Sequence, residues 1–278
     1  NKEGAPGEFR VNTYVSGQQY YPSIGSLKDG GFVVTWRDDS GSSHGGGSSY
    51  DIFGQRYGAD GAPAGGEFLV NTYKSGTQQT PSVAGLKGGG FVVTWEDHSG
   101  SSHNGGQNSD IYGQRYDAAG AKVGDEFRVN AVQFSGQQYD PSVVSLKEGG
   151  FVVAWRDDQG SSHNDGTSVG NGYDVWARVF KADGTQSVAE FRVNATHFSG
   201  SQYEPSVASL SNGGFVVSWR DDQGSSHDDG TGVGSSYDVW ARVFNANGTQ
   251  VTPEFRVNSY VSGSQYEPSV VGLEAGGF

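Results

Sequence analysis

Aspartate residues recur at two fixed places in four loops, each of which follows a tryptophan. One aspartate lies two residues after the tryptophan, and the other closes the loop where the next apolar run begins. Carboxylates and loop carbonyls suit Ca²⁺, which takes about six to eight oxygen ligands in flexible geometry. One interpretation is therefore that these loops hold calcium sites, at Asp38, Asp51, Asp97, Asp110, Asp157, Asp174, Asp221 and Asp238.

Two other interpretations of these loops stay open. Aspartate side chains also accept hydrogen bonds from nearby backbone N–H groups, and this turn-capping role is the favoured interpretation. A histidine recurs eight residues after each tryptophan, at His44, His103, His163 and His227. Histidine is a poor ligand for a hard cation, so a transition-metal site is the third interpretation.

A second recurring loop joins glutamine and tyrosine just before a Pro-Ser pair. Amide groups beside exposed tyrosine rings could bind sugar hydroxyls, with one shallow site in each repeat. The alternative, which is favoured, is that the glutamines bond the backbone between repeats. The candidate ligand-binding residues are Gln19, Tyr20, Gln79, Gln138, Tyr139, Gln202, Tyr203, Gln265 and Tyr266.

No residue set in the sequence singles out a catalytic centre. Serine, histidine and aspartate recur in every repeat, as structural residues do, whereas a catalytic group should break the repeat symmetry. His98 and His197 lie outside the recurring histidine position, and each is interpreted as an incidental loop substitution. Nothing distinguishes two carboxylates as a glycosidase pair. The prediction is that the chain is not an enzyme.

These loops are spaced by a repeated strand pattern. The run Gly-Gly-Phe-Val-Val-Thr-Trp at residues 30–36 returns, with small changes, at 89–95, 149–155 and 213–219, and Glu-Phe-(Arg/Leu)-Val-Asn follows at fixed offsets. Each period holds four candidate strands joined by Gly-rich turns, and no segment has helical periodicity. Four antiparallel strands per repeat predict an all-β fold with propeller-like blades. A linear β-solenoid is the alternative.

The repeats divide the chain into one repeat domain, residues 1–278. A partial repeat over 1–21 comes first. Full repeats follow over 22–80, 81–140, 141–204 and 205–267, and a fifth begins at 268–278. The chain has no methionine and stops within a strand pattern, so we expect it to be an excerpt of a longer protein.

The composition narrows the possible partners. Lys+Arg 18 against Asp+Glu 31 gives a net charge of −13, which argues against nucleic acid and anionic membrane surfaces. No apolar run is long enough to insert in a membrane, and without cysteine there is no disulfide or thiolate chemistry. The possible partners that remain are a second copy of the chain and an extracellular glycan.

The ordered motifs Gly-Gly-Phe-Val-Val-Thr-Trp, Gly-Gln-Arg-Tyr and Glu-Phe-Arg-Val-Asn resemble the repeats of large secreted bacterial proteins of the calcium-associated, RTX-type and adhesin-like kind. The resemblance implies an extracellular or cell-surface location and no catalytic residues. The RTX nonapeptide itself is absent. The resulting prediction is a non-enzymatic structural or adhesive module that could polymerise and be stabilised by calcium. The alternative is a multivalent lectin with one shallow site per blade.

Overall fold

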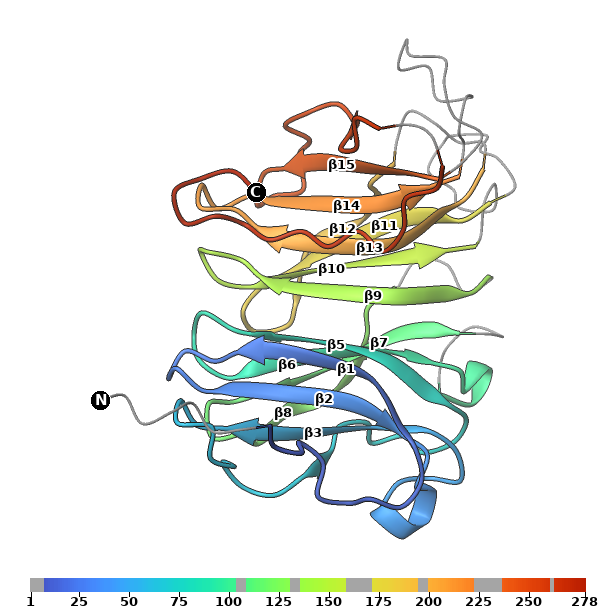
Figure 1. Cartoon of the computed structure of the whole chain (residues 1–278), viewed down its shortest axis with the longest axis vertical. Coiled ribbons are helices and arrows are strands. Elements are labelled where there is room, and N and C mark those ends of the chain that lie inside the picture. Colours follow the sequence, from blue (N-terminus) through green and yellow to red (C-terminus); the bar gives the residue numbers. More distant parts are fainter. Residues whose placement is uncertain are drawn as a thin grey trace.

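The computed structural model describes residues 8–103, 109–130, 136–158, 172–194, 200–222, 237–260 and 263–278. These residues form four sheets, each with four antiparallel strands in chain order, so every sheet is one repeat. Figure 1 shows the sheets following one another along the molecule from blue to red. The prediction of a β-propeller with four-stranded blades is confirmed. The solenoid alternative is wrong, because every strand pair in the described ranges is antiparallel.

The strands are numbered along the chain, and the sheets are called blades 1 to 4. Blades 1 and 2 consist of β1 (Gln19–Ser26), β2 (Phe32–Asp38), β3 (Asp51–Tyr57), β4 (Phe68–Leu69), β5 (Gln78–Gly85), β6 (Phe91–Asp97), β7 (Asp110–Tyr116) and β8 (Lys122–Arg128). Blades 3 and 4 consist of β9 (Gln138–Ser145), β10 (Phe151–Asp157), β11 (Asp174–Phe180), β12 (Gln186–Arg192), β13 (Gln202–Ser209), β14 (Phe215–Asp221), β15 (Asp238–Phe244) and β16 (Phe255–Arg256).

Helix is limited to two 3₁₀ turns among the described residues, η1 (Gly41–His44) and η2 (Gly100–His103). Both lie in loops that follow the tryptophan strands. The part of the chain that the structure describes has no helix with the length and apolar character needed to span a membrane.

The second strand of each blade is apolar on both faces because both faces are covered, by neighbouring blades or, on the outer sides of blades 1 and 4, by the flanking residues Val11 and Val270. Phe91 and Trp95 of β6 pack with Val33 and Ile52 of blade 1 in a single buried cluster. The four strand tryptophans at 36, 95, 155 and 219 are at most 3% exposed, as the sequence predicts. Burying an aromatic side chain of this size stabilises the fold by a few kcal/mol, so the contacts between blades dominate the core.

The first strand of each blade lies against the first strand of the next one, and the Pro-Ser motif links them. The Ser23 hydroxyl of β1 accepts a hydrogen bond from the backbone N–H of Val83 in β5 at 3.1 Å. Ser82 and Ser142 repeat this contact with the next blades, also at 3.1 Å. These inner strands therefore run side by side in one direction, so their starts gather at one end of the propeller and their ends at the other.

Residues that flank the blades continue the same packing. The carbonyl of Val11 accepts a hydrogen bond from the Tyr57 hydroxyl at 2.8 Å, just as Val70 does from Tyr116 in the next blade. At the other side, the backbone N–H of Val270 donates to the Ser206 hydroxyl at 3.2 Å.

Candidate functional site

The recurring aspartates are buried, and they lie opposite each other at the ends of paired strands. Asp38 of β2 pairs in register with Asp51 of β3, and the other three blades repeat the pair. Each second aspartate accepts a short hydrogen bond from an asparagine of the fourth-strand motif; for Asp51 the donor is the Asn71 amide at 2.6 Å. The carboxylates therefore fasten the outer strand to the end of the blade.

The recurring histidine joins the same network in blades 1 and 2. His103 contacts Asp97 through Nδ1 at 2.7 Å and Glu126 through Nε2 at 3.2 Å. Its ring is stacked between Tyr73 and Tyr112, at 4.2 and 4.1 Å. Burial alone would lower the pKa of His103, but the hydrogen bonds and charges of the two carboxylates outweigh burial and raise the pKa to about 9. The loop is thus held by a charged, sandwiched imidazole.

These contacts leave the predicted calcium sites as a prediction. Among the described residues no group of three or more histidine, aspartate and glutamate side chains is arranged to hold a metal ion. His163 and His227, and His197, lie outside the described residues.

The recurring glutamines lie in this network as well. Gln138 is buried, and its amide accepts from Asn130 at 3.0 Å and donates to Asp157 at 3.2 Å. In blade 2 the equivalent residue is Gln78, which pairs with Asp97, and not Gln79. Gln79 occupies the place that tyrosine holds in the other blades. Whether Gln19, Gln138, Gln202 and Gln265 contact a ligand stays a prediction.

The predicted tyrosines do come together, in a row at the starting end of the inner strands. The Arg156 guanidinium lies over the rings of Tyr139, Tyr173 and Tyr203, at 4.7, 4.5 and 5.3 Å. Tyr203 also packs on Arg220, at 4.5 Å. Ring contacts of 5.4–6.4 Å connect this row through Tyr139, Tyr173, Tyr203, Tyr237 and Tyr266. Such rings present a rigid, amphipathic surface.

Blade 1 carries a second piece of this row. Arg37 lies 4.8 Å from the rings of Tyr20 and Tyr21 and 4.1 Å from Tyr50. Blade 2 lies between these two parts of the row and interrupts it. Where blade 1 has Tyr20, Arg37 and Tyr50, blade 2 has Gln79, Glu96 and Ser109 in the same order.

The interruption gathers polar groups that no other blade has. Glu96 is 2% exposed, and its Oε2 accepts from the Gln79 amide at 2.9 Å and lies 3.2 Å from His98 Nε2. His98 Nδ1 is 2.7 Å from the Ser109 hydroxyl. Gln79 also accepts a hydrogen bond from Arg37 at 3.0 Å, which ties blade 1 to this cluster. A histidine held between a buried carboxylate and a hydroxyl can accept and release protons.

Asp140 of blade 3 completes the cluster. Its backbone N–H donates to Glu96 Oε1 at 2.8 Å, and its Oδ2 lies 3.4 Å from Arg156 Nε. Burial raises the pKa of Asp140 to about 6, and the negative charges of Glu96 and Glu204 outweigh part of the opposing effect of Arg156. A carboxyl that titrates near pH 6 can donate a proton at mildly acidic pH.

The backbone at Asp140 has an uncommon, left-handed conformation. The residue before each inner-strand proline has a φ of 51–53°, although none is glycine: Tyr21, Thr80, Asp140, Glu204 and Glu267. Such a conformation costs on the order of 1–3 kcal/mol and is concentrated at functional sites. The positive φ coincides with a shift in the pairing of the first two strands of each blade; in blade 1, Tyr21 lies within the shift between Tyr20 and Ser23.

The sequence carries one signal for this cluster, in the two positions at which blade 2 departs from the repeat pattern. The principle that catalytic groups break repeat symmetry applies to Glu96 and His98, which replace an arginine and an aspartate. The interpretation of His98 as an incidental substitution is wrong, because its surroundings are formed by Gln79 of β5, Asp140 of β9 and Ser109, which are distant in the sequence.

Comparisons with solved structures show that several known proteins share this fold. The chain is similar to an α-L-arabinanase of Penicillium chrysogenum complexed with arabinobiose (TM-score 0.59, 16% identity, covering 95% of this chain and 75% of that one). It is also similar to the GH93 α-L-arabinofuranosidase of Fusarium graminearum with arabinobiose (0.58, 12%, 86% and 66%) and to a Hadza microbial sialidase (0.54, 13%, 84% and 46%). The chain thus spans about half of the sialidase and about two thirds of the arabinofuranosidase. No protein-family model and no curated protein matches the sequence.

These findings correct three predictions. The resemblance to RTX-type, adhesin-like surface proteins is wrong: no family model supports it, and the solved structures that share the fold include glycoside hydrolases and an ulvanlyase, a polysaccharide lyase. The prediction of a non-enzymatic structural or adhesive module, with its lectin alternative, is overturned by the same neighbours, and so is the prediction that the chain is not an enzyme. These predictions relied on the recurrence of the same residues in every repeat. The strands do recur, but blade 2 carries Glu96 and His98 where the other blades carry arginine and aspartate.

Proposed function

We propose that this chain is part of a glycan-processing enzyme that cleaves a glycosidic bond where blades 2 and 3 meet. The observation that supports this most is the replacement of the tyrosine–arginine row by Glu96 and His98 beside a carboxyl, Asp140, whose pKa is raised to about 6. The proposal agrees with the activities of proteins that share the fold, which include an α-L-arabinofuranosidase, an α-L-arabinanase and a polysaccharide lyase.

Asp140 is the proton donor in this proposal. Cleavage of a glycosidic bond needs an acid beside the leaving oxygen, and the protonated carboxyl supplies it while the C–O bond breaks. Arg156, 3.4 Å away, stabilises the carboxylate left after proton transfer. Because Asp140 is only half-buried, a sugar can reach it.

His98 is the proton acceptor for the attacking water. Its Nε2–H faces the Glu96 carboxylate, which can only accept, so Nδ1, 2.7 Å from the Ser109 hydroxyl, takes the proton that water loses as the water oxygen bonds to the sugar carbon. Glu96 Oε2, 3.2 Å from Nε2, then stabilises the imidazolium. His98 is 29% exposed, whereas Glu96 is buried, so His98 meets the substrate and Glu96 positions it.

The tyrosine–arginine rows on both sides of the cluster bind the glycan chain. Tyrosine rings pack against the apolar faces of sugar rings, and their hydroxyls reach sugar hydroxyls. The rows extend from Tyr20 in blade 1 to Tyr266 beside blade 4, which provides several subsites along one chain. A glycan substrate of this kind also favours an extracellular or cell-surface location.

The test is a panel of polysaccharides, incubated with the native protein and with one variant. Arabinan, sialylated glycans and ulvan are incubated with the protein and with Asp140→Asn, and new reducing ends are measured. The proposal expects release from at least one substrate and its loss in the variant. No release from any of them, or equal release by Asp140→Asn, contradicts the assignment.

Calcium binding at the paired aspartates is a separate proposal, and so is self-association. Calorimetric titration of Ca²⁺ into chelator-treated protein tests the first. Heat of binding together with a higher melting temperature supports it, and the absence of both leaves the aspartates with their hydrogen-bonding role. Light scattering tests the second, since a strictly monomeric particle at high concentration contradicts it.

A further inference from the structure

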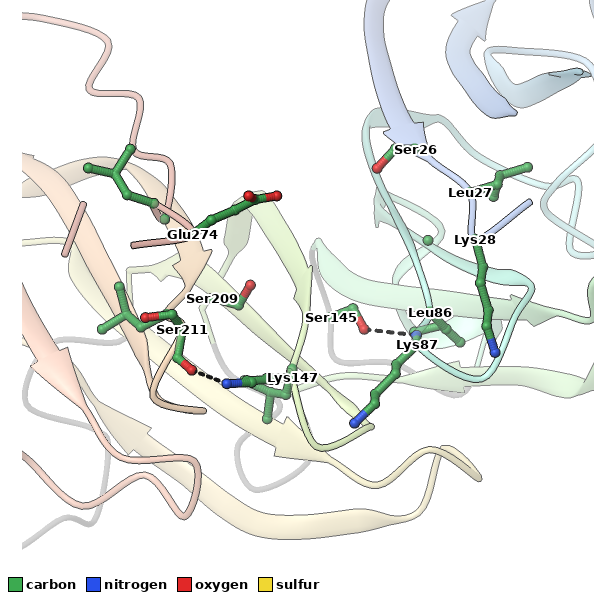
Figure 2. A pocket seen from close by; sticks show the side chains of 15 residues that line it. Ser26, Leu27, Lys28, Leu86, Lys87, Ser145, Lys147, Ser209, Ser211 and Glu274 are labelled. Carbon is green, nitrogen blue, oxygen red and sulfur yellow. Dashed lines mark hydrogen bonds between the residues drawn. The ribbon is translucent and has the colours of Figure 1, made fainter. Parts of the chain in front are cut away.

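The opposite end of the inner strands holds a cavity of about 540 Å³, far from the proposed catalytic cluster. Corresponding residues from the ends of the inner strands and the turns after them line it, together with residues 272–274 (Figure 2). Its volume lies in the range of small-molecule sites. Each blade contributes residues from equivalent positions, so the side chains that differ between blades determine which ligand the cavity can bind.

The lining is basic in an acidic protein. Three of the seven lysines in the sequence line this cavity, at Lys28, Lys87 and Lys147, while Glu274 is the single acidic residue there. The lining therefore has a net charge of +2 (three minus one) within a chain of net charge −13. In Figure 2 the side chain of Lys87 extends between those of the other two. A local reversal of charge of this kind attracts anions.

The acidic residues nearby do not neutralise these lysines. Glu148 is 3.9 Å from Lys87, but the two side chains are 74% and 55% exposed, so this pair is weak. The Lys147 amine donates to the Ser211 carbonyl in the next blade, a neutral acceptor that leaves its charge unpaired. Lys28 makes no ion pair within the part of the chain that the structure describes, and its side chain is exposed.

The rest of the lining suits a sugar ring. Hydroxyl groups of Ser26, Ser145 and Ser209 alternate with leucine side chains, of which Leu146 and Leu210 are buried in the wall. Hydroxyls offer both donors and acceptors, and leucines offer an apolar surface. A simple inorganic anion would need only the lysines, whereas a ring with hydroxyls and acidic groups uses all three kinds of side chain.

We propose that this cavity is a second binding site, specific for an acidic oligosaccharide that carries carboxylate or sulfate groups. Lys28, Lys87 and Lys147 bind the anionic groups, and the serine hydroxyls bind the ring. The site is separate from the catalytic cluster, and its existence does not depend on the chemistry assigned to Asp140.

Isothermal titration at low ionic strength tests the site, with three probes of equal length: an oligogalacturonate, a sulfated oligosaccharide and a neutral oligosaccharide. The first two compare carboxylate with sulfate. Each single Lys→Gln variant at 28, 87 and 147 should weaken binding of the preferred anionic probe about two- to fivefold, and the triple variant about tenfold or more. Lys181→Gln, in an exposed turn outside the cavity, is the matched control and should leave binding unchanged.

The outcomes separate this site from the proposed active site. Binding of an acidic probe that the triple variant loses, that weakens as salt rises and that Asp140→Asn leaves intact supports the proposal. Equal binding of the neutral probe, an unchanged triple variant, or no binding of either acidic probe overturns it. Loss of binding in Asp140→Asn alone assigns the anion to the catalytic end and also overturns it.

Discussion

The buried carboxylate of Glu96 in blade 2 accepts a hydrogen bond from the backbone N–H of Asp140 in blade 3, at 2.8 Å. This bond joins the one blade that breaks the tyrosine–arginine row to the residue whose carboxyl titrates near pH 6. It also crosses the boundary between two repeats, 44 residues apart in sequence. The proposed chemistry therefore belongs to a junction and not to any single repeat.

Asp140→Asn should reduce turnover about 10²–10⁴-fold, because the amide cannot donate the acidic proton. In the native enzyme the acid must be protonated, and burial raises its pKa to about 6. Turnover should therefore fall as pH rises through about 6. A pH–rate profile of kcat on the substrate found in the panel measures this.

Asp125→Asn, at an exposed position of β8, is the control and should keep full turnover. A profile that stays flat between about pH 4.5 and 7.5, roughly one and a half units to either side of the Asp140 pKa of about 6, would remove Asp140 from the role of acid.

His98→Asn should abolish most of the activity without unfolding the protein. Asparagine has nearly the shape of aspartate, which the other blades carry there at Asp39, Asp158 and Asp222, so the loop accommodates it. We expect turnover to fall by about 10²-fold or more, because an amide cannot accept the proton. Melting temperature and kcat are the two measurements, and an active variant would contradict the assignment.

Glu96→Gln separates positioning from substrate contact. Glu96 is 2% exposed and touches His98, Gln79 and Asp140, so it should affect kcat while KM stays within about twofold. Steady-state kinetics on one substrate decides the matter. A large rise in KM with unchanged kcat would instead mean that Glu96 binds the glycan.

Tyr203→Ala should weaken glycan binding by about 1–2 kcal/mol, which is roughly five- to thirtyfold. The ring lies at the centre of the row, over both Arg156 and Arg220. Tyr203→Phe keeps the ring and should retain most of the affinity, so the pair distinguishes stacking from hydroxyl bonding. Affinity for an oligosaccharide, measured in an Asp140→Asn background, is the readout. Equal affinity in both variants and the parent would exclude the row as the binding surface.

His103 should make stability depend on pH. Its pKa is raised from 6.5 to about 9 in the folded protein, so its contribution is complete below about pH 6.5 and is lost as pH rises through about 9. His103→Gln, which cannot be charged, should reduce the difference in melting temperature between these two pH values. Its loss of stability at pH 6.5 should be about 1.5–3 kcal/mol, the usual contribution of hydrogen bonds to charged groups. A pH difference identical to that of the parent protein would contradict this.

The strands and their grouping into blades follow from the sequence because the pattern that determines them is local. Phe-Val-Val-Thr-Trp is apolar on both faces wherever it occurs, so each copy must be covered on both sides, and four copies predict four stacked sheets. The buried tryptophans and the four strands per repeat needed no further information. The tyrosines of the second loop could also be singled out, since they return at one position.

The candidate site depended on tertiary structure, since its members are far apart in the chain and each is ordinary alone. The adjacent pair Gln78 and Gln79 shows the reason most directly. A strand has a side-chain period of two, so a shift of one residue sends Gln78 into the buried asparagine–aspartate network and Gln79 to the proposed site. The prediction that Gln79 is the recurring glutamine is wrong, because two adjacent glutamines look alike in the sequence and only the pairing of β5 with β6 distinguishes them. In the same way, the proximity of Glu96 to Asp140 and the raised pKa of Asp140 come from blades packing together, which no local pattern encodes.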